Sequence, residues 1–444
     1  MNPEIFKAYD IRGKVGTELT KEVAWNVGQA MADWLPNDGA VAVGRDMRPD
    51  SEELAQAVIE GLRLQGREVI DIGLVSTDMI YFAVGKFGLA GGAMVTASHN
   101  PGEYNGIKLC REEAKPIGIE TGLADIRDGV IAGNFSPANK KGSLKTQDVK
   151  EDWIKYVLSF VEADKWPAYK VAIDAGNGML GAIAPVLSKH VPLQITPMFY
   201  ELDGTFPNHP ADARTEEGMA DLQAKVREES LDFGIAFDGD GDRVALVDGQ
   251  GEVLTGTVMT AILAHYYLAK EPGAAILYNA TIGDVVPQSV RREGGVAHRV
   301  KVGNSYMRVG MRQHNAIFGG EAAGHYFFRD NWFADSGLLA AIIAIQVLVD
   351  SDKKLSELAN QFRIYPAIPE TVLKVHDKKA MIEKIKHNFS DGAQDELDGI
   401  TVRYKDAWLN VRPSNTEPVL RLNVEAKDEV ALNELVARVK QVIQ

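Results

Sequence analysis

A serine and a histidine stand side by side at the end of an apolar segment. The stretch Met94–Gly106 reads MVTASHNPGEYNG, and in it Ser98 and His99 are followed at once by Asn-Pro-Gly. A serine that follows a strand can act as a nucleophile when a neighbouring group activates it. Asn-Pro-Gly is also an ordinary turn signal, and the chain lacks the Gly-X-Ser-X-Gly elbow of an α/β-hydrolase. The pair, on what we expect to be an exposed loop, therefore leaves a nucleophile and a structural turn both open.

Three carboxylates alternate with glycine in the stretch DGDGDR. The glycines let such a loop fold back on itself, so that Asp238, Asp240 and Asp242 can aim at one point. Oxygen ligands in this density suit Mg²⁺ or Ca²⁺. An EF-hand is excluded, because its sixth and twelfth positions need glycine and glutamate and here hold Arg243 and Gly249. A solvated acidic turn is the alternative, but three carboxylates between two apolar strands repel one another. The pattern therefore favours a metal site.

Two further stretches offer groups that bind phosphates or sugars. RPSNTEP begins at Arg412, whose guanidinium can bind a phosphate through two parallel hydrogen bonds, and the following residues offer short donors and backbone N–H groups. A polar turn that opens a strand is the alternative. GGEAAGH contains Glu321, which can accept hydrogen bonds from sugar hydroxyls, and His325, which can titrate near neutral pH. A glycine-rich structural turn explains these letters equally well.

One glycine-rich stretch points to a function that the rest of the chain does not support. GNGMLG, at Gly176–Gly181, matches the dinucleotide-binding pattern by its letters, with Asp203 more than twenty residues further on. No residues for hydride-transfer chemistry accompany it, and a tight turn between a strand and a helix explains the glycines as well. The chain also contains no Walker A motif. We therefore favour the tight turn.

The stretches that carry chemistry lie between short β-branched runs that alternate with amphipathic segments. Strand–helix–strand spacing of this kind indicates parallel sheets with helices on their faces, and the pattern restarts twice along the chain. In its first part, a helix should begin with Ser51 as its cap. We predict an α/β protein with three similar mixed-sheet α/β domains and a smaller C-terminal α+β domain. The expected domains are 1–145, 146–250, 251–365 and 366–444.

Length and composition exclude several classes of protein. The chain has 444 residues, is 45% hydrophobic and carries a formal net charge of −14, which argues against nucleic acid or an anionic membrane as a partner. A phosphate site must then be a local cluster of Arg, Lys and backbone N–H groups. The single cysteine, Cys110, allows no intrachain disulfide and fits a reducing cytosol, so we expect a cytoplasmic protein. The longest apolar run, 338–349, is too short to span a bilayer and should form a buried helix.

Taken together, these motifs resemble those of the α-D-phosphohexomutase family, in the order that the family uses. The segments that carry the resemblance are YDIRG, TASHNP, NGIK, DGDGDR, GEAAGH and RPSNTEP, and they span nearly the whole chain. The most similar branch is that of the bacterial phosphomannomutases and phosphomannomutase/phosphoglucomutases. The resemblance implies four domains around one central cleft, an intramolecular phosphotransferase activity and a small-molecule hexose phosphate as substrate. It leaves a monomer or a homodimer open.

The resemblance also implies a role for individual residues. Ser98 would be the phosphoserine that hands its phosphoryl group to the sugar, and its phosphate would complete the shell of an Mg²⁺ held by Asp238, Asp240 and Asp242. General acid and base roles around the reacting oxygen would fall to Arg12, Lys108, Lys301 and His325. The residues that would bind the substrate are Tyr9, His99, Arg243, Glu321, Ala323, Arg412, Ser414, Asn415, Thr416 and Arg421. A hexose 1,6-bisphosphate would serve as activator.

The expected reaction is the reversible interconversion of mannose 1-phosphate and mannose 6-phosphate, through phosphoserine and a bound hexose 1,6-bisphosphate. One departure from the family affects the substrate: its sugar loop usually reads Gly-Glu-X-Ser-Gly-His, and here Ala323 replaces the serine. A sugar contact worth roughly 0.5–1.5 kcal/mol is thereby missing. The enzyme could also act on glucose phosphates. Two alternative functions stay open, phosphoglucomutase and phosphoglucosamine mutase. So do a metal-dependent phosphatase and a non-catalytic sugar-phosphate-binding protein.

Overall fold

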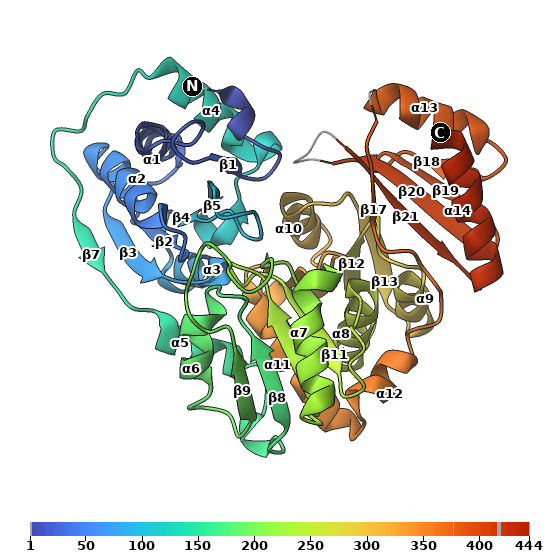
Figure 1. The fold of residues 1–444 in the computed structure, drawn as a ribbon. Coiled ribbons are helices and arrows are strands. Elements are labelled where there is room, and N and C mark those ends of the chain that lie inside the picture. The colour runs from blue at the N-terminus through green and yellow to red at the C-terminus, as the bar shows by residue number, and fades with distance from the viewer. Residues whose placement is uncertain (1, 376, 415–418, 444) are drawn as a thin grey trace.

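The computed structural model describes residues 2–375, 377–414 and 419–443 and arranges them in four sheets that follow one another along the chain (Figure 1). The strands of the first sheet are β1 (Ile11–Lys14), β2 (Val41–Arg45), β3 (Val69–Leu74), β4 (Gly91–Val95), β5 (Tyr104–Arg111), β6 (Lys115–Pro116) and β7 (Leu144–Thr146). Its order is β1-β5-β4-β2-β3-β7, with β6 on β5. The pairs β4–β2, β2–β3 and β3–β7 are parallel, whereas β5 is antiparallel to its neighbours. The helices of this part are α1 (Lys21–Trp34), α2 (Ser51–Leu64), α3 (Thr77–Phe87) and α4 (Ala124–Ala132).

The second and third sheets are also mixed. The second has the order β11-β10-β8-β9 and contains β8 (Lys170–Asp174), β9 (Gln194–Met198), β10 (Phe233–Phe237) and β11 (Val244–Asp248). The third has the order β13-β12-β14-β15-β16, with β12 (Ala275–Asn279), β13 (Val296–Val300), β14 (Phe318–Gly320), β15 (Tyr326–Phe328) and β16 (Ala334–Asp335). The helices around them are α5 (Lys150–Leu158), α6 (Leu180–Leu187), α7 (Glu216–Glu228), α8 (Gly256–Lys270), α9 (Val285–Arg292), α10 (Asn304–Gln313), α11 (Gly337–Ser351) and α12 (Leu355–Asn360).

The fourth sheet is antiparallel and has a core of its own. Its strands, in the order β17-β21-β20-β19-β18, are β17 (Thr371–Leu373), β18 (Ala393–Asp395), β19 (Ile400–Arg403), β20 (Ala407–Pro413) and β21 (Leu420–Ala426), and its helices are α13 (Lys378–Asn388) and α14 (Glu429–Ile443). Apolar residues of these elements form one cluster, separate from the large cluster that runs through the first three sheets. The structure thus has three α/β parts that share a core and one α+β part beside them, as the sequence predicts. The exact domain boundaries stay a prediction.

The apolar run near residue 340 forms the buried helix that the sequence predicts. It makes up most of α11, whose residues from Gly337 to Leu348 are all buried, and it packs against α8, β11 and α5. Burial on every side explains why this helix has no polar face. No helix in the described part of the chain has both the length and the hydropathy needed to cross a bilayer.

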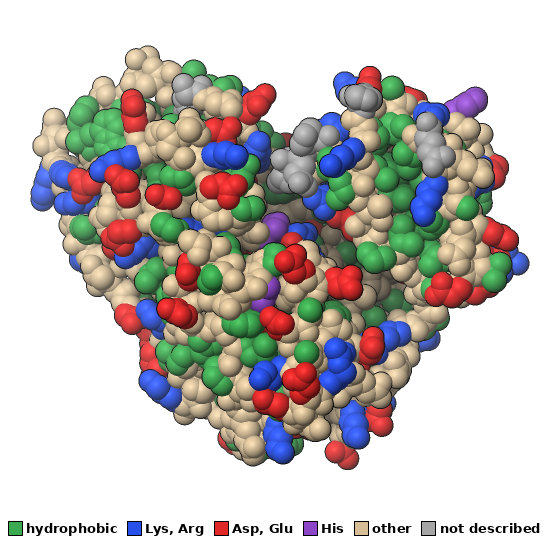
Figure 2. Space-filling view, in the orientation of Figure 1, with side chains coloured by type: hydrophobic (Ala, Val, Ile, Leu, Met, Phe, Trp, Pro, Cys, Tyr) green, Lys and Arg blue, Asp and Glu red, His purple; other side chains and the backbone are tan. Residues whose placement is uncertain are grey.

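Each sheet carries one functional motif of the sequence on a loop between two consecutive antiparallel strands. The serine loop (96–103) joins β4 to β5, and the acidic loop (238–243) joins β10 to β11. The Glu321 loop (321–325) joins β14 to β15, and the C-terminal loop (414–419) joins β20 to β21. The first three of these loops meet, because Ser98 bonds to Asp238 and Arg243 bonds to His325. The space-filling view shows the molecular surface hollowed between these parts (Figure 2).

Candidate active site

Ser98 is buried, in contrast to its expected place on an exposed loop, whereas Pro101 and Glu103 further along the serine loop are exposed. Ser98 is 1% exposed, and its Oγ donates a hydrogen bond to Asp238 Oδ2 in the acidic loop at 2.8 Å. The two loops also touch through their backbones: a Cβ at Gly239 would lie 2.6 Å from the carbonyl oxygen of Ser98, so this contact requires glycine. Ser98 itself has a φ of 54°, a left-handed conformation that costs energy for serine and that the surrounding contacts must hold.

The acidic loop gathers its three carboxylates as their spacing predicts. Asp238, Asp240 and Asp242 are fully buried, and each offers an oxygen within 4.8 Å of those of the other two. Gly241 between them has a φ of 74°, which glycine adopts without strain. Burial, followed by the charges of Asp240 and Asp242, raises the pKa of Asp238 to about 8. Three ionised carboxylates at this distance are unfavourable without a positive partner.

The geometry of this cluster fits a divalent cation such as Mg²⁺. The Oδ1 atoms of Asp240 and Asp242 are buried and accept no hydrogen bond from the residues that the structure describes. Their Oδ2 atoms both form ion pairs with the Lys108 ammonium, which lies 2.7 Å from that of Asp240. The Lys108 ammonium and the Arg243 guanidinium, whose Nε lies 3.8 Å from Asp238 Oδ2, bring two positive charges to three carboxylates. Oxygen ligands therefore remain for a cation that prefers them.

Positive side chains surround the serine loop, although the chain as a whole is acidic. Burial lowers the pKa of His99 well below its ordinary value, and the charges of Arg243, Arg214 and Arg12 lower it further. Arg12 comes from β1, which pairs with β5, and its guanidinium donates to Asn100 Oδ1 at 2.7 Å. This is the local cluster of cations that an acidic protein needs in order to bind a phosphate.

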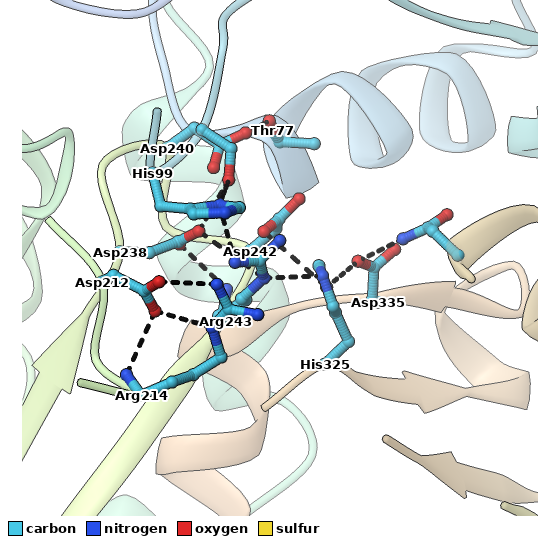
Figure 3. A network of polar contacts seen from close by, with 12 residues as sticks. Thr77, His99, Asp212, Arg214, Asp238, Asp240, Asp242, Arg243, His325 and Asp335 are labelled. Carbon is cyan, nitrogen blue, oxygen red and sulfur yellow. Dashed lines mark hydrogen bonds and ion pairs between the residues drawn. The ribbon is translucent and has the colours of Figure 1, made fainter. Parts of the chain in front are cut away.

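Arg243 connects two histidines (Figure 3). Its Nη1 donates to His99 Nδ1 at 2.7 Å and its Nε donates to His325 Nε2 at 2.8 Å. A guanidinium can only donate, so both accepting nitrogens are unprotonated. His325 then carries its proton on Nδ1, which donates to Asp335 Oδ2 at 2.8 Å. Although Asp242, His325 and Asp335 lie close enough to hold an ion, the Nδ1 that faces the two carboxylates carries a proton and therefore cannot be a metal ligand.

The Glu321 loop and its neighbours line the third sheet's side of the site. Glu321 is 2% exposed, and its Oε1 accepts hydrogen bonds from Asn279 Nδ2 at 3.1 Å and from the backbone N–H of Gly303 at 3.0 Å. These two bonds fix the position of the carboxylate. Ala323, two residues further on, is half-buried. The loop is therefore an ordered element with a fixed acidic group.

Tyr9 and Lys301 lie where the first and third sheets approach each other. The ring of Tyr9 rests against Gly303, where a Cβ would lie 2.5 Å from that ring. It also meets the ring of Tyr306 edge-on, with 6.4 Å between centroids. Lys301 is exposed, and its ammonium lies 5.5 Å from the centroid of the Tyr306 ring. These two predicted site residues are thus neighbours of one aromatic side chain.

The C-terminal part brings two arginines to one carboxylate. Arg412 on β20 and Arg421 on β21 are directly opposite each other in the sheet. Arg412 Nη2 donates to Glu370 Oε2 at 2.9 Å, and Arg421 Nη1 donates to Glu370 Oε1 at 2.6 Å. Burial raises the pKa of Glu370, but the two guanidinium groups outweigh it and hold that pKa below its ordinary value. Buried Ser414 follows Arg412 closely and bonds across the hairpin, its N–H donating to the carbonyl of Val419 at 2.9 Å.

The predicted site residues thus fall into three groups. The direct contacts described above link one group, made of Ser98, His99, Arg12, Lys108, Asp238, Asp240, Asp242, Arg243 and His325. The second, on the third sheet's side, holds Tyr9, Lys301, Glu321 and Ala323. The third holds Arg412, Ser414 and Arg421 in the C-terminal part, across the hollow seen in Figure 2. Asn415 and Thr416 lie outside the described residues.

Family models match the chain in four successive parts. The alpha/beta/alpha domains I, II and III of phosphoglucomutase/phosphomannomutase match residues 3–134, 151–251 and 255–365, and the C-terminal domain of the same proteins matches 370–442. The chain belongs to the phosphoglucomutase/phosphomannomutase family. It is therefore a phosphohexomutase, an enzyme that acts as a phosphotransferase and isomerase.

Individual relatives of this phosphohexomutase cover its whole length. Phosphohexose mutases of Xanthomonas campestris pv. campestris (strain B100) are 38% identical over 432 residues, which make up 97% of this chain and 96% of the relative. The phosphomannomutase of Salmonella montevideo is 35% identical, with 100% of this chain and 99% of the relative covered. The crystal structure of a phosphoglucomutase/phosphomannomutase family protein from Burkholderia thailandensis superposes with a TM-score of 0.91 at 31% identity, over 100% of this chain and 97% of that one. The fold class, the family and the enzymatic character predicted from the sequence are confirmed.

Several residues of the phosphohexomutase site were not singled out in the sequence. Asp335 accepts a hydrogen bond from His325 Nδ1, Glu370 joins the two arginines of the C-terminal part, and the hydroxyl of Thr77 donates a hydrogen bond to Asp240. Arg48 donates a hydrogen bond to the backbone carbonyl of Ser98 in the serine loop. None of these lies inside a recognisable motif. One feature of the sequence could have pointed to Arg48: it stands in a loop that directly follows a predicted strand, as Ser98 and Asp238 do.

Proposed function

We propose that this phosphohexomutase is a phosphomannomutase, which interconverts mannose 1-phosphate and mannose 6-phosphate and accepts glucose phosphates as a second substrate pair. The observation that carries the proposal is the hydrogen bond from Ser98 Oγ to Asp238, at the edge of three buried carboxylates and among several cations. A hydroxyl in that place is suited to carry a phosphoryl group. The choice of mannose is supported by relatives named phosphomannomutase, among them those of Salmonella montevideo and Vibrio cholerae, which are 35% and 37% identical.

In the proposed reaction, phosphorylated Ser98 donates its phosphoryl group to a free hydroxyl of the bound hexose monophosphate. The sugar oxygen forms a bond to phosphorus as the bond from phosphorus to Ser98 Oγ breaks. The sugar hydroxyl loses its proton to a base, and the departing Ser98 Oγ takes up a proton and becomes a free hydroxyl again. The resulting hexose 1,6-bisphosphate turns over in the site and returns its other phosphoryl group to Ser98. The same bisphosphate, added from outside, would phosphorylate a resting enzyme and so act as activator.

The residues around the serine supply the charges and the proton acceptor for this step. Asp238, Asp240 and Asp242 would hold Mg²⁺, which when bound draws charge from the transferring phosphoryl group. Arg12, Arg243 and Lys108 would balance the remaining negative charge. His325 offers an unprotonated Nε2 as the proton acceptor once Arg243 turns toward the phosphate. His99 would orient the loop, because its Nδ1 already accepts a hydrogen bond from Arg243.

The non-reacting phosphate would be held by the C-terminal part of the chain. We assign Arg412, Ser414, Asn415, Thr416 and Arg421 to this clamp, with Tyr9 on the facing side. The acid or base role of Lys301 at the reacting oxygen stays a prediction. Glu321 and the position of Ala323 would contact the sugar hydroxyls. Because the two ends of the bisphosphate exchange places, one clamp must accept both, and the C-terminal domain with its separate core is suited to close over the substrate and reopen.

Replacing Arg412 by lysine should raise the KM for mannose 1-phosphate by about tenfold or more, because an ammonium group cannot make the two parallel bonds that a guanidinium makes to a phosphate. Steady-state kinetics with a coupled assay would measure it. Arg438→Lys is the control, since Arg438 lies on α14 and pairs with Asp391 instead. A KM within about twofold of the native value would remove Arg412 from the clamp.

Replacing Ala323 by serine restores the hydroxyl that the family usually has and should lower the KM for hexose phosphates by about two- to tenfold, the equivalent of one hydrogen bond. Ala322→Ser is the matched control, because Ala322 packs against the apolar core and its hydroxyl would face away from the sugar. Kinetics with mannose and glucose 1-phosphates would show which sugar gains. If both variants left the KM values unchanged, position 323 would not contact the substrate.

A competition experiment followed by phosphorus NMR tests the function itself. The enzyme would receive Mg²⁺, a trace of hexose 1,6-bisphosphate, and the 1-phosphates of mannose, glucose and glucosamine in one tube. Conversion of mannose 1-phosphate to the 6-phosphate, alone or with glucose, is the expected result. Conversion of glucosamine 1-phosphate alone would overturn the substrate and keep the mechanism. Release of inorganic phosphate would indicate a phosphatase, and no turnover by folded protein would indicate a binding protein.

A further inference from the structure

A buried arginine outside the known motifs holds the serine loop in place. Arg48 lies in the turn after β2 and is 3% exposed. Its guanidinium donates to four backbone carbonyl groups of one short segment: those of Ser98 at 2.8 Å, Asn100 at 2.5 Å, Pro101 at 2.8 Å and Tyr104 at 2.8 Å. Charge-assisted hydrogen bonds of this kind are among the stronger ones in proteins. A single side chain thus ties together the whole length of the loop.

Arg48 is itself fixed from two other directions. Its Nε donates to Asp46 Oδ2 at 3.2 Å, and Asp46 also accepts a hydrogen bond from Ser51 Oγ at 2.5 Å. Ser51 in turn accepts one from Asn105 Nδ2 at 2.9 Å. On its remaining face the guanidinium lies 5.1 Å from the centroid of the Phe206 ring, which belongs to the part of the chain that builds the second sheet. The guanidinium therefore has little freedom to move.

We propose that Arg48 is the positioning residue of the serine loop, which it holds so that Ser98 Oγ faces Asp238 and the incoming sugar hydroxyl. The loop needs such support, because Ser98 adopts a left-handed backbone conformation. Arg48 acts through the backbone, since its hydrogen bonds go to carbonyl oxygens. This inference rests on the proposed function, in which Ser98 carries the phosphoryl group. Group transfer is sensitive to placement, and a shift of about 1 Å can cost roughly a hundredfold in rate.

A second buried arginine of the same domain, Arg67, provides a control that distinguishes a positioning role from a purely structural one. Arg67 is 8% exposed, and it too donates to backbone carbonyl groups, with Nε 3.1 Å from that of Ala32 and Nη2 3.0 Å from that of Leu35. These carbonyls belong to the end of α1 and the residue after it, not to the serine loop. Arg67→Lys removes the same kind of hydrogen bonds as Arg48→Lys and leaves Ser98 untouched.

The test compares the first phosphoryl transfer in the two variants. Enzyme phosphorylated on Ser98 would be mixed with excess mannose 1-phosphate and Mg²⁺, and the loss of phosphoserine followed by quenched flow. We expect Arg48→Lys to transfer about 10- to 100-fold more slowly, with a KM within about twofold of the native value because the clamp is untouched. Arg67→Lys should lower the melting temperature and leave the transfer rate unchanged. A native rate in Arg48→Lys, or an equal loss in Arg67→Lys, would overturn the proposal.

A double variant and a parallel measurement keep the test decisive. If Arg48→Lys yields too little folded protein, Asp46→Asn combined with Arg48→Gln removes the buried ion pair as a unit and should transfer at least about tenfold more slowly; a native rate in this variant also overturns the proposal. Ser98→Ala is measured alongside. An inactive Ser98→Ala enzyme with a native Arg48→Lys rate discards only the role of Arg48, whereas a fully active Ser98→Ala enzyme discards the proposed function.

Discussion

Replacing Ser98 by alanine is expected to reduce mutase turnover by about a thousandfold or more, because the group that carries the phosphoryl between the two sugar oxygens is removed. The fold should tolerate the change. Alanine fits the same space, and the backbone hydrogen bond from the N–H of residue 98 to Thr96 Oγ1 remains. The lost bond from Ser98 Oγ to Asp238 is of a kind worth about 1–3 kcal/mol. The variant should therefore stay folded, with only a modest decrease in melting temperature, while its turnover is almost lost.

Two measurements check this expectation independently. Steady-state turnover of mannose 1-phosphate gives the activity, and mass spectrometry of the peptide that contains the serine loop shows whether the protein takes up phosphate from hexose 1,6-bisphosphate. Ser289→Ala is the matched control, because Ser289 is a buried serine on α9 whose hydroxyl bonds to the backbone of its own helix. Retention of more than about a tenth of the native kcat in Ser98→Ala would show that the phosphoryl group travels by another route.

The sequence predicted which side chains come together in the site better than it predicted whether those side chains are buried or exposed. The alternation of aspartate and glycine implied that Asp238, Asp240 and Asp242 meet at one point, and they do because Gly241 turns the loop locally. Ser98, by contrast, is predicted to lie on an exposed loop and is buried. Its cover is the acidic loop, 140 residues away in the chain, and a contact of that range leaves no trace in the residues next to Ser98.

Residues that act at long range were missed for the same physical reason. Arg48 and Glu370 bond to groups that lie 50 and 42 residues away in the chain and that only the tertiary fold brings near. Ser51 shows the local version of the problem. Its expected role as a helix cap is wrong, because α2 begins at Ser51 with Asp50 as the cap residue, and the hydroxyl of Ser51 donates to Asp46 instead. A polar side chain at a helix start can serve the helix or a neighbour, and the sequence does not tell which.

Replacing Asp238 by asparagine should raise the stability of the metal-free protein and lower its activity in the presence of Mg²⁺. Asparagine keeps an oxygen for the backbone N–H of Arg243, which lies 3.2 Å away, and an amide to pair with Ser98 Oγ. It removes one of three buried, mutually repelling carboxylates. In buffer with EDTA, the variant should therefore melt at a higher temperature than the native protein. Its turnover in Mg²⁺ should nevertheless fall by about a hundredfold or more.

Added Mg²⁺ should reverse the order of the two melting temperatures. A cation that binds only the folded protein stabilises it by RT ln(1 + [L]/Kd), about 2.7 kcal/mol at a hundred times the dissociation constant, and the native cluster should gain far more of this than Asp238→Asn. The control is Asp248→Asn on β11, which removes a fully buried carboxylate paired with Arg363. It should lower the melting temperature equally with and without Mg²⁺. A native protein that melts at the same temperature in EDTA and in excess Mg²⁺ would mean that the three carboxylates serve the fold and hold no cation.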